Sequence, residues 1–316
     1  MQSATRAHRL LSRRPLLQRR PYSTPALDVP QLLKNTAQSV KNTDYDSFIC
    51  GSLLPPKSRD AYFVLKAWNI EVATIQDVTS DPRAALGRLK FWRETVKACF
   101  EGKPPSGLPL ATLLAGAIEE FNLSPIHFKR ILDRREKDIR NQSIGTIEDM
   151  EAFGEETASS LLYLTLQLNG INHIPTDHAA SHVGKALGIT TLLRSTAYHA
   201  QKRKNYLPVS IMAKHGLSEE SLFRGQAADP NSAPGKALHE VAFESASSAK
   251  VHLDKAREMS KDLSKDAKRV LLPAALAEDF LTTLQKKDFN LFDASLAKRN
   301  PLVIFRLGWN SYRNTF

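Results

Sequence analysis

Hydrophobic residues recur at spacings of three and four along most of the chain, which is the pattern of amphipathic α-helices. One such stripe, within 84–101, consists of Leu89, Trp92, Val96 and Phe100. A second stripe, within 273–288, consists of Leu276, Phe280, Leu281 and Leu284. No segment alternates between apolar and polar residues for long enough to indicate a β-sheet. The pattern therefore predicts an all-α protein.

Residues that typically cap helices divide the chain into further elements. The helices that they predict are 125–140 after Ser124, 147–168 after Thr146, 177–198 after Thr176-Asp177, and a long polar-faced helix over 236–263. Segment 225–235 contains Gly, Pro, Asp, Asn and Ser, so we expect a mobile loop there. Mixed charges over 129–138 indicate an exposed helical face.

The basic charge is concentrated at the beginning of the chain. The 44 basic and 33 acidic residues give a formal net charge of +11, but residues 1–28 hold six arginines and no acid before Asp28. Without this segment the charge falls to roughly +5 by the same counting. An Arg-rich, acid-free segment with leucines among the charges is typical of a mitochondrial presequence. We expect a presequence over 1–27, with cleavage near Tyr22, and one α-helical domain over 28–316. The alternative is a basic arm that binds RNA or acidic lipid.

Composition and motifs exclude several classes of protein. Cys50 and Cys99 are the only cysteines and lie far apart, which leaves no zinc ribbon or disulfide framework. The longest apolar stretches are shorter than about 18 residues, so no membrane-spanning helix is expected. A nucleic-acid partner is not expected either, because the chain after the leader is only mildly basic. No Gly-rich phosphate loop or nucleophile motif is present, and we expect no cofactor.

Two groups of residues could carry chemistry by their spacing alone. His178 and His182 are four residues apart on a predicted helix, so both imidazoles could bind one metal ion. Ala179 stands where a zinc protease would have its glutamate, and no third ligand is nearby. Structural or solvent-facing histidines are therefore the preferred interpretation. The basic run Lys202-Arg203-Lys204 is either a solvated turn or a site for a diphosphate or lipid headgroup.

Several motifs together resemble the squalene and phytoene synthases. Ser47-Phe48, Leu54-Pro55 and Arg59 correspond to the opening pattern of that family. The segment from 184 to 194, followed by Tyr206-Leu207-Pro208, resembles a second pattern of the family. The similarity extends over nearly all of the chain after the leader. It implies the isoprenoid-synthase fold, in which helices surround a central apolar cavity.

Synthases of this family bind magnesium through two DxxxD motifs, which neutralise the leaving diphosphate. By the resemblance, the acids of the first motif fall on Ala73 and Asp77. Those of the second fall on Ser195 and His199, so three of the four carboxylates are absent. The resemblance therefore implies that the chain has no magnesium site and no catalytic residues, and that it is a pseudoenzyme.

A shifted alternative is Asp77-Val78-Thr79-Ser80-Asp81, which also has the DxxxD spacing. It lies one helical turn too far along the chain and runs into Pro82, which disfavours helix at Asp81. A chance match is the preferred interpretation.

Longer runs resemble a non-synthase branch of the same family, which carries a mitochondrial presequence and acts in the assembly of respiratory complex I (NADH:ubiquinone oxidoreductase). These runs are 68–73, 159–166 and 177–186. The resemblance implies a non-catalytic protein on the matrix side of the mitochondrial inner membrane, with complex I subunits or assembly intermediates as partners. The alternative is a mitochondrial transferase or binding protein that uses a prenyl diphosphate or another lipid through a degenerate site.

A remnant polar site is expected beside the cavity, where a lipid or prenyl ligand could bind. Its candidate residues are Asp77, Arg59, Arg194, Lys202, Arg203, Lys204 and Tyr206. For Asp77 and Arg194, a buried ion pair between two helices is an equal alternative. The final stretch, 301–316, combines aliphatic residues, aromatics and arginines. This composition suits a helix at a membrane surface and also a helix docked on the core.

Overall fold

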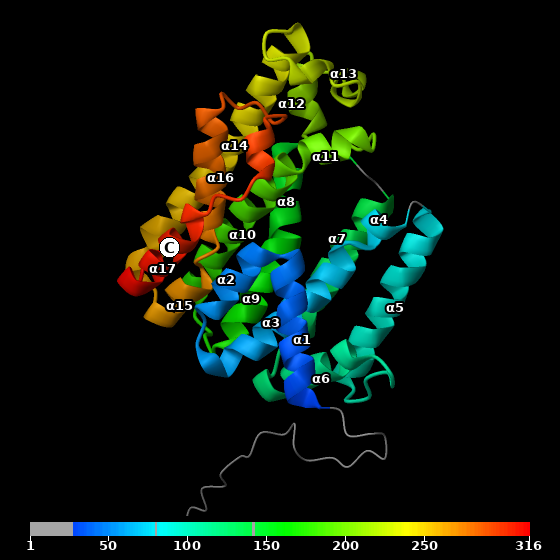
Figure 1. Cartoon of the computed structure of the whole chain (residues 1–316), viewed down its shortest axis with the longest axis vertical. Helices are drawn as coiled ribbons and strands as arrows, with labels where there is room; N and C mark the ends of the chain where they lie inside the picture. The colour runs from blue at the N-terminus through cyan, green and yellow to red at the C-terminus, as the bar shows by residue number, and fades with distance from the viewer. Residues whose placement is uncertain (1–27, 80, 141–142) are drawn as a thin grey trace, which may run out of the picture.

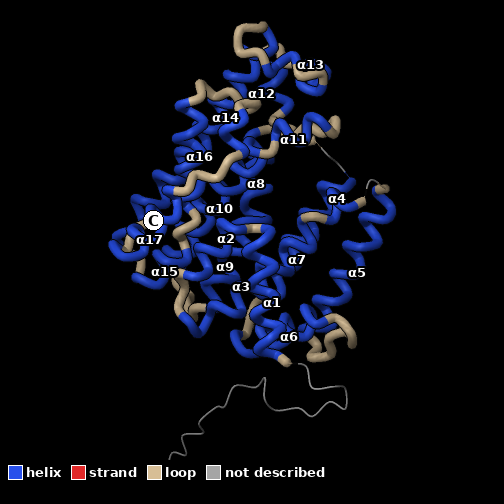
Figure 2. Tube along the Cα trace, in the orientation of Figure 1, coloured by secondary structure: helices blue, strands red, loops and turns tan. Residues whose placement is uncertain are grey.

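The computed structural model describes residues 28–79, 81–140 and 143–316 of the chain. The predicted presequence, residues 1–27 with cleavage near Tyr22, lies outside the described residues. Across these ranges the regular structure is helical, as Figures 1 and 2 show, and Ile144 and Pro208 form an isolated β-bridge. The predicted all-α fold is confirmed.

The helices follow one another mostly through short connections. Their bounds are α1 Val29–Thr43, α2 Tyr45–Ser52, α3 Pro56–Ala73, α4 Ile75–Val78, α5 Pro82–Phe100, α6 Pro109–Phe121, α7 Pro125–Arg140, α8 Ile147–Gly154, α9 Ser160–Leu168, α10 Ile174–Arg194, α11 Thr196–Gln201, α12 Val209–Lys214, α13 Glu219–Phe223, α14 Ala233–Glu258, α15 Lys265–Val270, α16 Ala274–Lys286 and α17 Leu302–Arg313. A π-helical segment, Glu155–Ser159, joins α8 to α9.

The apolar stripes predicted from the sequence lie where helices pack. The buried members of the two stripes are Leu89, Trp92 and Val96 on α5, and Phe280, Leu281 and Leu284 on α16. Helix α7 has the predicted bounds, 125–140. Its charged face, in contrast, is not fully exposed as predicted, because Arg134 and Asp138 are buried as an ion pair with a 2.7 Å Nε–Oδ1 distance.

Helix α10 lies at the centre of the molecule (Figure 1) and packs against α8, α14, α16 and the π-helical segment. A helix that is surrounded by others has to be apolar around its circumference. Accordingly, α10 buries residues on every side between Thr176 and Leu193, and many of them are alanine or glycine. These small side chains allow the neighbouring helices to approach closely.

Glycines bring the backbone of α10 directly against α8 and the π-helical segment. A Cβ atom at Gly188 would lie 2.3 Å from Gly154 Cα, and one at Gly184 would lie 2.4 Å from the backbone nitrogen of Ser159. Larger side chains therefore do not fit at these positions unless the helices separate. Because Gly188 also lines the central cavity described below, this contact sets the position of one cavity wall.

Several predicted boundaries need correction. Helix α10 begins at Ile174, before the predicted cap at Thr176-Asp177, because Pro175 suits a first helical turn. It ends at Arg194 instead of 198, and α11 follows. The predicted helix 147–168 has its Thr146 cap but is interrupted by the π-helical segment.

The region predicted as a long helix over 236–263 starts earlier and ends earlier. Ser232 caps α14 by accepting a hydrogen bond from the Gly235 N–H at 3.0 Å, and α14 ends at Glu258. The preceding segment 225–235 contains a 3₁₀ turn over Gln226–Ala228.

Helix α17 is docked on the core through one face. Leu307 is buried in a small cluster with Cys50, Leu272 and Ala275, and Val303 is buried on the same helix. The opposite face of α17 is exposed. In the described ranges, no helix combines the length and the hydropathy needed to cross a bilayer.

Candidate functional site

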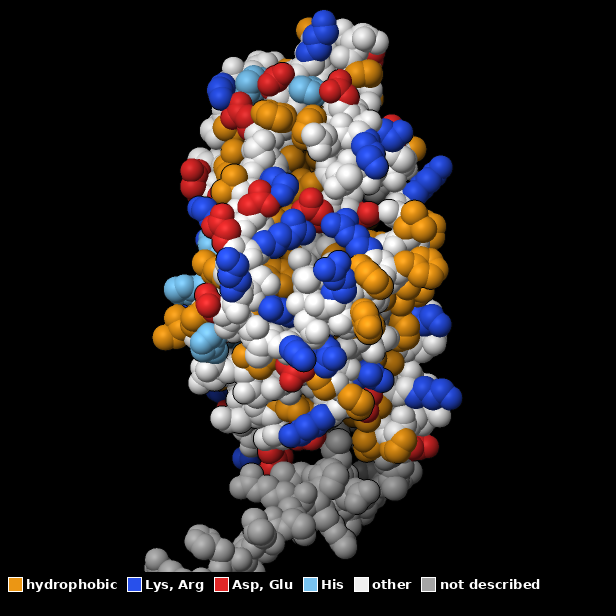
Figure 3. Space-filling model, turned by 90° about the vertical axis from the view of Figure 1, so that its left-hand side faces the viewer, with side chains coloured by type: hydrophobic (Ala, Val, Ile, Leu, Met, Phe, Trp, Pro, Cys, Tyr) orange, Lys and Arg blue, Asp and Glu red, His pale blue; other side chains and the backbone are white. Residues whose placement is uncertain are grey.

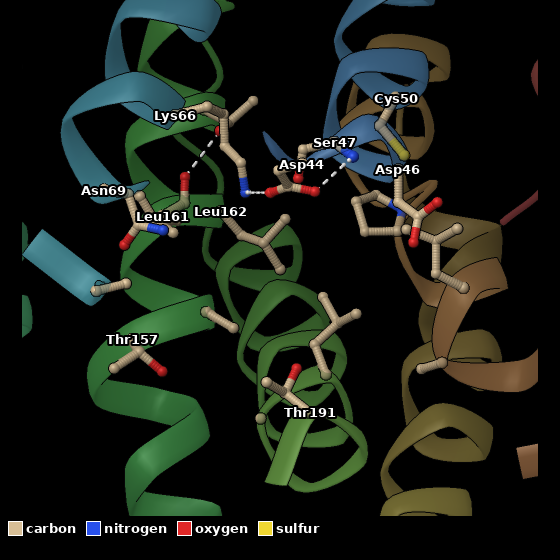
Figure 4. A pocket seen from close by; sticks show the side chains of 18 of the residues that line it. Asp44, Asp46, Ser47, Cys50, Lys66, Asn69, Thr157, Leu161, Leu162 and Thr191 are labelled. Carbon is tan, nitrogen blue, oxygen red and sulfur yellow. Dashed lines mark hydrogen bonds and ion pairs between the residues drawn. The ribbon is translucent and has the colours of Figure 1, made fainter. Parts of the chain in front are cut away.

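A central cavity of about 410 Å³ lies among α2, α3, α9, α10 and α16, and Figure 4 shows it from close by. Leucine side chains such as Leu161 and Leu162 form one part of its wall. Charged and amide side chains form another part, so the cavity is more polar than the apolar one that the family resemblance implied. Its lining holds four basic side chains and two acidic ones.

Lys66 is the one charged residue in the mostly buried run 61–68 of α3. Its Nζ lies 3.4 Å from Asp44 Oδ2 at the cavity wall (Figure 4). Burial opposes ionisation of Asp44, but Lys66 and hydrogen bonds with Ser47 outweigh burial and hold the pKa of Asp44 below its usual value. The pair is therefore charged, and it fixes the end of α1 and the start of α2 to α3.

Arg194 forms a second, longer ion pair, in which its Nη1 lies 3.8 Å from Asp46 Oδ2 on α2. Burial raises the pKa of Asp46, and the nearby Arg194 opposes this effect in part. The ion pair considered between Asp77 and Arg194 is not formed.

Two further guanidinium groups line the cavity without full hydrogen bonding. The Nε atoms of Arg135 and Arg269 are buried and have no partner among the described residues, and the same holds for Asn69 Oδ1. A buried polar atom left unpaired costs about 1–3 kcal/mol. The two donors therefore suit an anionic group or ordered water in the cavity.

The positions that the resemblance assigns to the two family motifs meet beside this cavity. Ala73 lines the cavity itself. Asp77, on α4, accepts a hydrogen bond from the Tyr198 hydroxyl at 3.1 Å, and Lys202 Nζ lies 3.3 Å from the same carboxylate oxygen. Lys202 also donates to Tyr198 Oη, a hydrogen bond that raises the pKa of Lys202. Asp77 thus faces an ammonium group.

Ser195 and His199, which the resemblance assigns to the second motif, make local contacts. Ser195 Oγ donates to the Leu192 carbonyl at 3.0 Å. The His199 ring lies against the Tyr206 ring, with 4.7 Å between centroids, and burial lowers the pKa of His199. The Tyr206 hydroxyl donates to Gln76 Oε1 at 3.2 Å, which connects this region to the first motif.

The other candidate residues lie apart from this contact. Arg59 donates from Nη2 to the Leu54 carbonyl at 3.0 Å. Arg203 pairs with Glu220 at 2.8 Å, whereas Lys204 is half-buried and does not line the cavity. The structure therefore gathers Asp77, Lys202 and Tyr206, and places Arg194 at the cavity with Asp46.

Asp81 does not share a helix with Asp77. Its backbone is extended, and its side chain caps α5 by accepting a hydrogen bond from the Arg83 N–H at 2.9 Å. The two acids of this alternative DxxxD spacing therefore lie on separate elements, Asp77 on α4 and Asp81 at the cap of α5.

His178 and His182 do not face each other as a metal-binding pair. His182 Nδ1 lies 2.8 Å from His252 Nδ1 on α14, and His252 Nε2 lies 3.1 Å from Glu151 Oε1 on α8, whereas His178 is exposed. Burial, and then His252, lower the pKa of His182 to about 4. Among the described residues, no three His, Cys, Asp or Glu side chains are grouped so that they could hold a metal ion.

A magnesium cluster of the synthase type does not fit the residues at this place. Hard divalent cations need several carboxylate oxygens, and the motif positions provide only Asp77. Lys202 and Tyr198 already contact its Oδ1. At Gly188, on the cavity wall, the backbone of α8 leaves no room for a side chain.

Sequence reasoning missed most of the polar cavity lining, namely Asp44, Asp46, Lys66, Asn69, Arg135 and Arg269. One signal was available, because a lone lysine within the apolar run 61–68 is unusual for a buried helix face. For Arg135 and Arg269 no such signal exists, since each lies in a charged segment of sequence.

Comparisons with known proteins agree with this fold. The Squalene/phytoene synthase family matches residues 40–304. Human "NADH dehydrogenase (ubiquinone) complex I, assembly factor 6" is 38% identical over 277 residues, which cover 88% of this chain and 81% of that protein. Its homolog from Dictyostelium discoideum is 35% identical over 302 residues, which cover 93% and 82%.

Squalene and dehydrosqualene synthases are among the solved structures that match. A dehydrosqualene synthase, solved in complex with ligand, superposes with a TM-score of 0.77 at 18% identity, covering 90% of this chain and 96% of that one. At this identity the likeness establishes the fold. The chain therefore belongs to the squalene/phytoene synthase family and, as expected, resembles those relatives in it that are named complex I assembly factors.

Proposed function

We propose that this protein is a non-catalytic member of its family that promotes the assembly of mitochondrial respiratory complex I. Its partners are complex I subunits or assembly intermediates, which it meets on the matrix side of the inner membrane as a peripheral protein. The relatives named as complex I assembly factors support this proposal, because the similarity covers most of their length.

The contact of Asp77 with Lys202 carries the non-catalytic part of the proposal. A prenyl diphosphate ionises when metal ions held between carboxylates stabilise the negative charge on its leaving group. A single carboxylate that is already paired with an ammonium group cannot form such a cage. What these side chains do is connect α4 to the end of α11, through Asp77, Tyr198 and Lys202.

Gene deletion tests the role in assembly. We expect mature complex I to disappear from native gels of mitochondrial membranes, and to return on expression of either the unchanged chain or Asp77→Asn. Normal complex I without the gene would refute the role. A folded Asp77→Asn chain that fails to restore complex I would show that the Asp77 carboxylate itself is needed for the assembly role.

The polar cavity supports a second candidate, which is binding of a lipid with an anionic headgroup. The unpartnered donors of Arg135 and Arg269 suit the headgroup, and Leu161, Leu162 and Phe280 suit an apolar tail. The test incubates the purified protein with farnesyl and geranylgeranyl diphosphate and Mg²⁺. Binding without product, weakened by Arg269→Gln, would support this candidate. Product formation that is lost in Asp77→Asn would instead identify an enzyme.

We also propose that residues 1–27 are the import signal. The acid-free, arginine-rich composition supports this. The N-terminal peptide of the protein from isolated mitochondria, measured by mass spectrometry, should begin near Tyr22. A peptide that begins at the initiator methionine would contradict it.

A further inference from the structure

The exposed face of α17 is an apolar stripe that nothing in the described chain covers. Leu302, Phe305, Trp309 and Tyr312 are 67%, 74%, 59% and 79% exposed. Their spacing of three, four and three residues places them on one side of the helix. Because the opposite side is anchored in the core by the fully buried Leu307, the stripe stays on the surface.

Isolated hydrophobic residues are common on protein surfaces, but contiguous apolar patches mark interaction sites. The other large exposed hydrophobic residues of the described ranges are spread over seven helices, with at most two on any one of them, whereas four fall on α17 alone. Figure 3 views the molecule from the side on which α17 lies, and hydrophobic side chains gather there next to lysines and arginines.

Basic residues flank this stripe, and acidic residues are missing. From 294 to 316 the chain has Lys298, Arg299, Arg306 and Arg313 but no Asp or Glu. The Arg313 guanidinium lies 5.9 Å from the centroid of the Trp309 ring, so charge and aromatic surface adjoin. The segment therefore presents apolar and cationic groups together.

We propose that this face of α17 docks on a lipid bilayer that contains anionic lipid. Helices at a membrane surface combine an apolar face of Leu, Phe and Trp with Lys and Arg that meet acidic headgroups, and Trp and Tyr favour the headgroup level. A second copy of this chain is a poorer occupant, because a two-fold contact through α17 would bring the same cations together. The inference deepens the proposed peripheral location by assigning the surface that makes the contact.

Tryptophan fluorescence can report this contact directly. Trp68 and Trp92 are 0% and 6% exposed, so Trp309 is the tryptophan whose surroundings change on docking. Equimolar vesicles of phosphatidylcholine and phosphatidylglycerol should shift the emission of the purified full chain to the blue. Pure phosphatidylcholine vesicles should give a much smaller shift. Trp309→Phe should keep binding in a flotation assay and lose the shift.

Variants of the stripe test its role in binding. Replacing Phe305 and Trp309 together by serine should weaken flotation with the mixed vesicles at least about tenfold. Arg306→Gln and Arg313→Gln should each weaken it by about fivefold. The matched control is Phe91→Ser, which removes an exposed aromatic ring from α5 and should leave binding unchanged. Since all these side chains are partly or fully exposed, the variants are expected to fold.

Three results would overturn the inference. They are the absence of binding to the mixed vesicles, equal binding by the Phe305→Ser/Trp309→Ser chain, and a lipid-free dimer in light scattering that this double variant abolishes. The proposed assembly role can be refuted independently of the docking surface. Vesicle binding together with normal complex I after gene deletion would refute the assembly role alone, and complex I loss without vesicle binding would refute only the docking surface.

Discussion

His182 and His252 are 70 residues apart in sequence, yet their Nδ1 atoms lie 2.8 Å from each other. The sequence suggests a different pairing, with His178, because a spacing of four residues is visible in it. A contact between α10 and α14 is not visible, since it depends on how the whole fold packs. The contacts of individual side chains are therefore what the sequence predicts least well.

Burial of His182, together with its contact to His252, makes stability depend on pH. The folded pKa of His182 is about 4, compared with 6.5 for a free histidine. Its contribution to stability is therefore complete above about pH 6.5 and is lost as the pH falls from there toward 4, because the unfolded chain then binds a proton that the folded chain excludes. We expect His182→Gln to reduce the fall in Tm between about pH 7 and pH 5 by on the order of 2 °C.

The exposed His178 provides the control for this measurement. His178→Gln should leave the pH dependence of Tm as it is in the unchanged chain. A profile that is identical for the unchanged chain and His182→Gln would show that His182 does not contribute.

Burial also decides which ion pair matters for stability. Arg134 is buried and donates to Asp138 at 2.7 Å, so Arg134→Met leaves the buried acid with only a longer contact, 3.7 Å from Arg135 Nη1. We expect a loss of about 3–5 kcal/mol in the free energy of unfolding by urea. Arg203→Met removes the exposed pair with Glu220 and should cost less than about 1 kcal/mol. Similar losses for the two variants would contradict this account.

Helices with a clear apolar stripe, such as α5, α7 and α16, are predictable from the sequence because the buried face alone specifies them. The π-helical segment is not, since Glu155–Ser159 shows no break in composition. The predicted start of α10 is also wrong, because composition alone does not show where a helix begins. Thr176 and Asp177 look like a cap, but Thr176 is buried inside the first turn, with its Oγ1 3.1 Å from His173 Nδ1.

The glycine contact between helices gives a prediction about packing. Gly188→Ala should lower the free energy of unfolding by about 1–3 kcal/mol, because its Cβ would lie 2.3 Å from Gly154 Cα. Gly87→Ala, on α5, meets no atom within 4 Å and should raise it by about 0.5–1 kcal/mol. Opposite signs in urea unfolding are the expected outcome. A neutral effect at Gly188 would show that α8 and α10 separate easily.

For the whole molecule, the family motifs were sufficient to predict the fold and a central cavity, because such patterns persist where packing requires them. They did not predict the charge of the cavity. Lys66, Arg135 and Arg269 come from three helices that meet only in the folded chain. Resemblance to synthases could not have shown these groups either, since they are not motif positions.

The proposed non-catalytic role can be tested by placing acids at the positions that the family resemblance assigns to the two motifs. We expect the chain with Ala73→Asp, Ser195→Asp and His199→Asp to form no prenyl product from farnesyl diphosphate and Mg²⁺. The reason is that Lys202 still neutralises Asp77 and that α8 still fills the space beside Gly188. Circular dichroism of the same sample serves as the folding control. Product formation by this variant would show that three carboxylates were all that was lacking.

The contact of Gly188 with Gly154 also bears on evolutionary history. Where two backbones touch, any single mutation that introduces a side chain lowers stability, whatever it does for binding in the cavity beside it. A larger residue at Gly188 or Gly154 would require the two helices to move apart at the same time. Selection for stability alone is therefore expected to keep both positions small, while the other cavity-lining positions are free to diversify in what they bind.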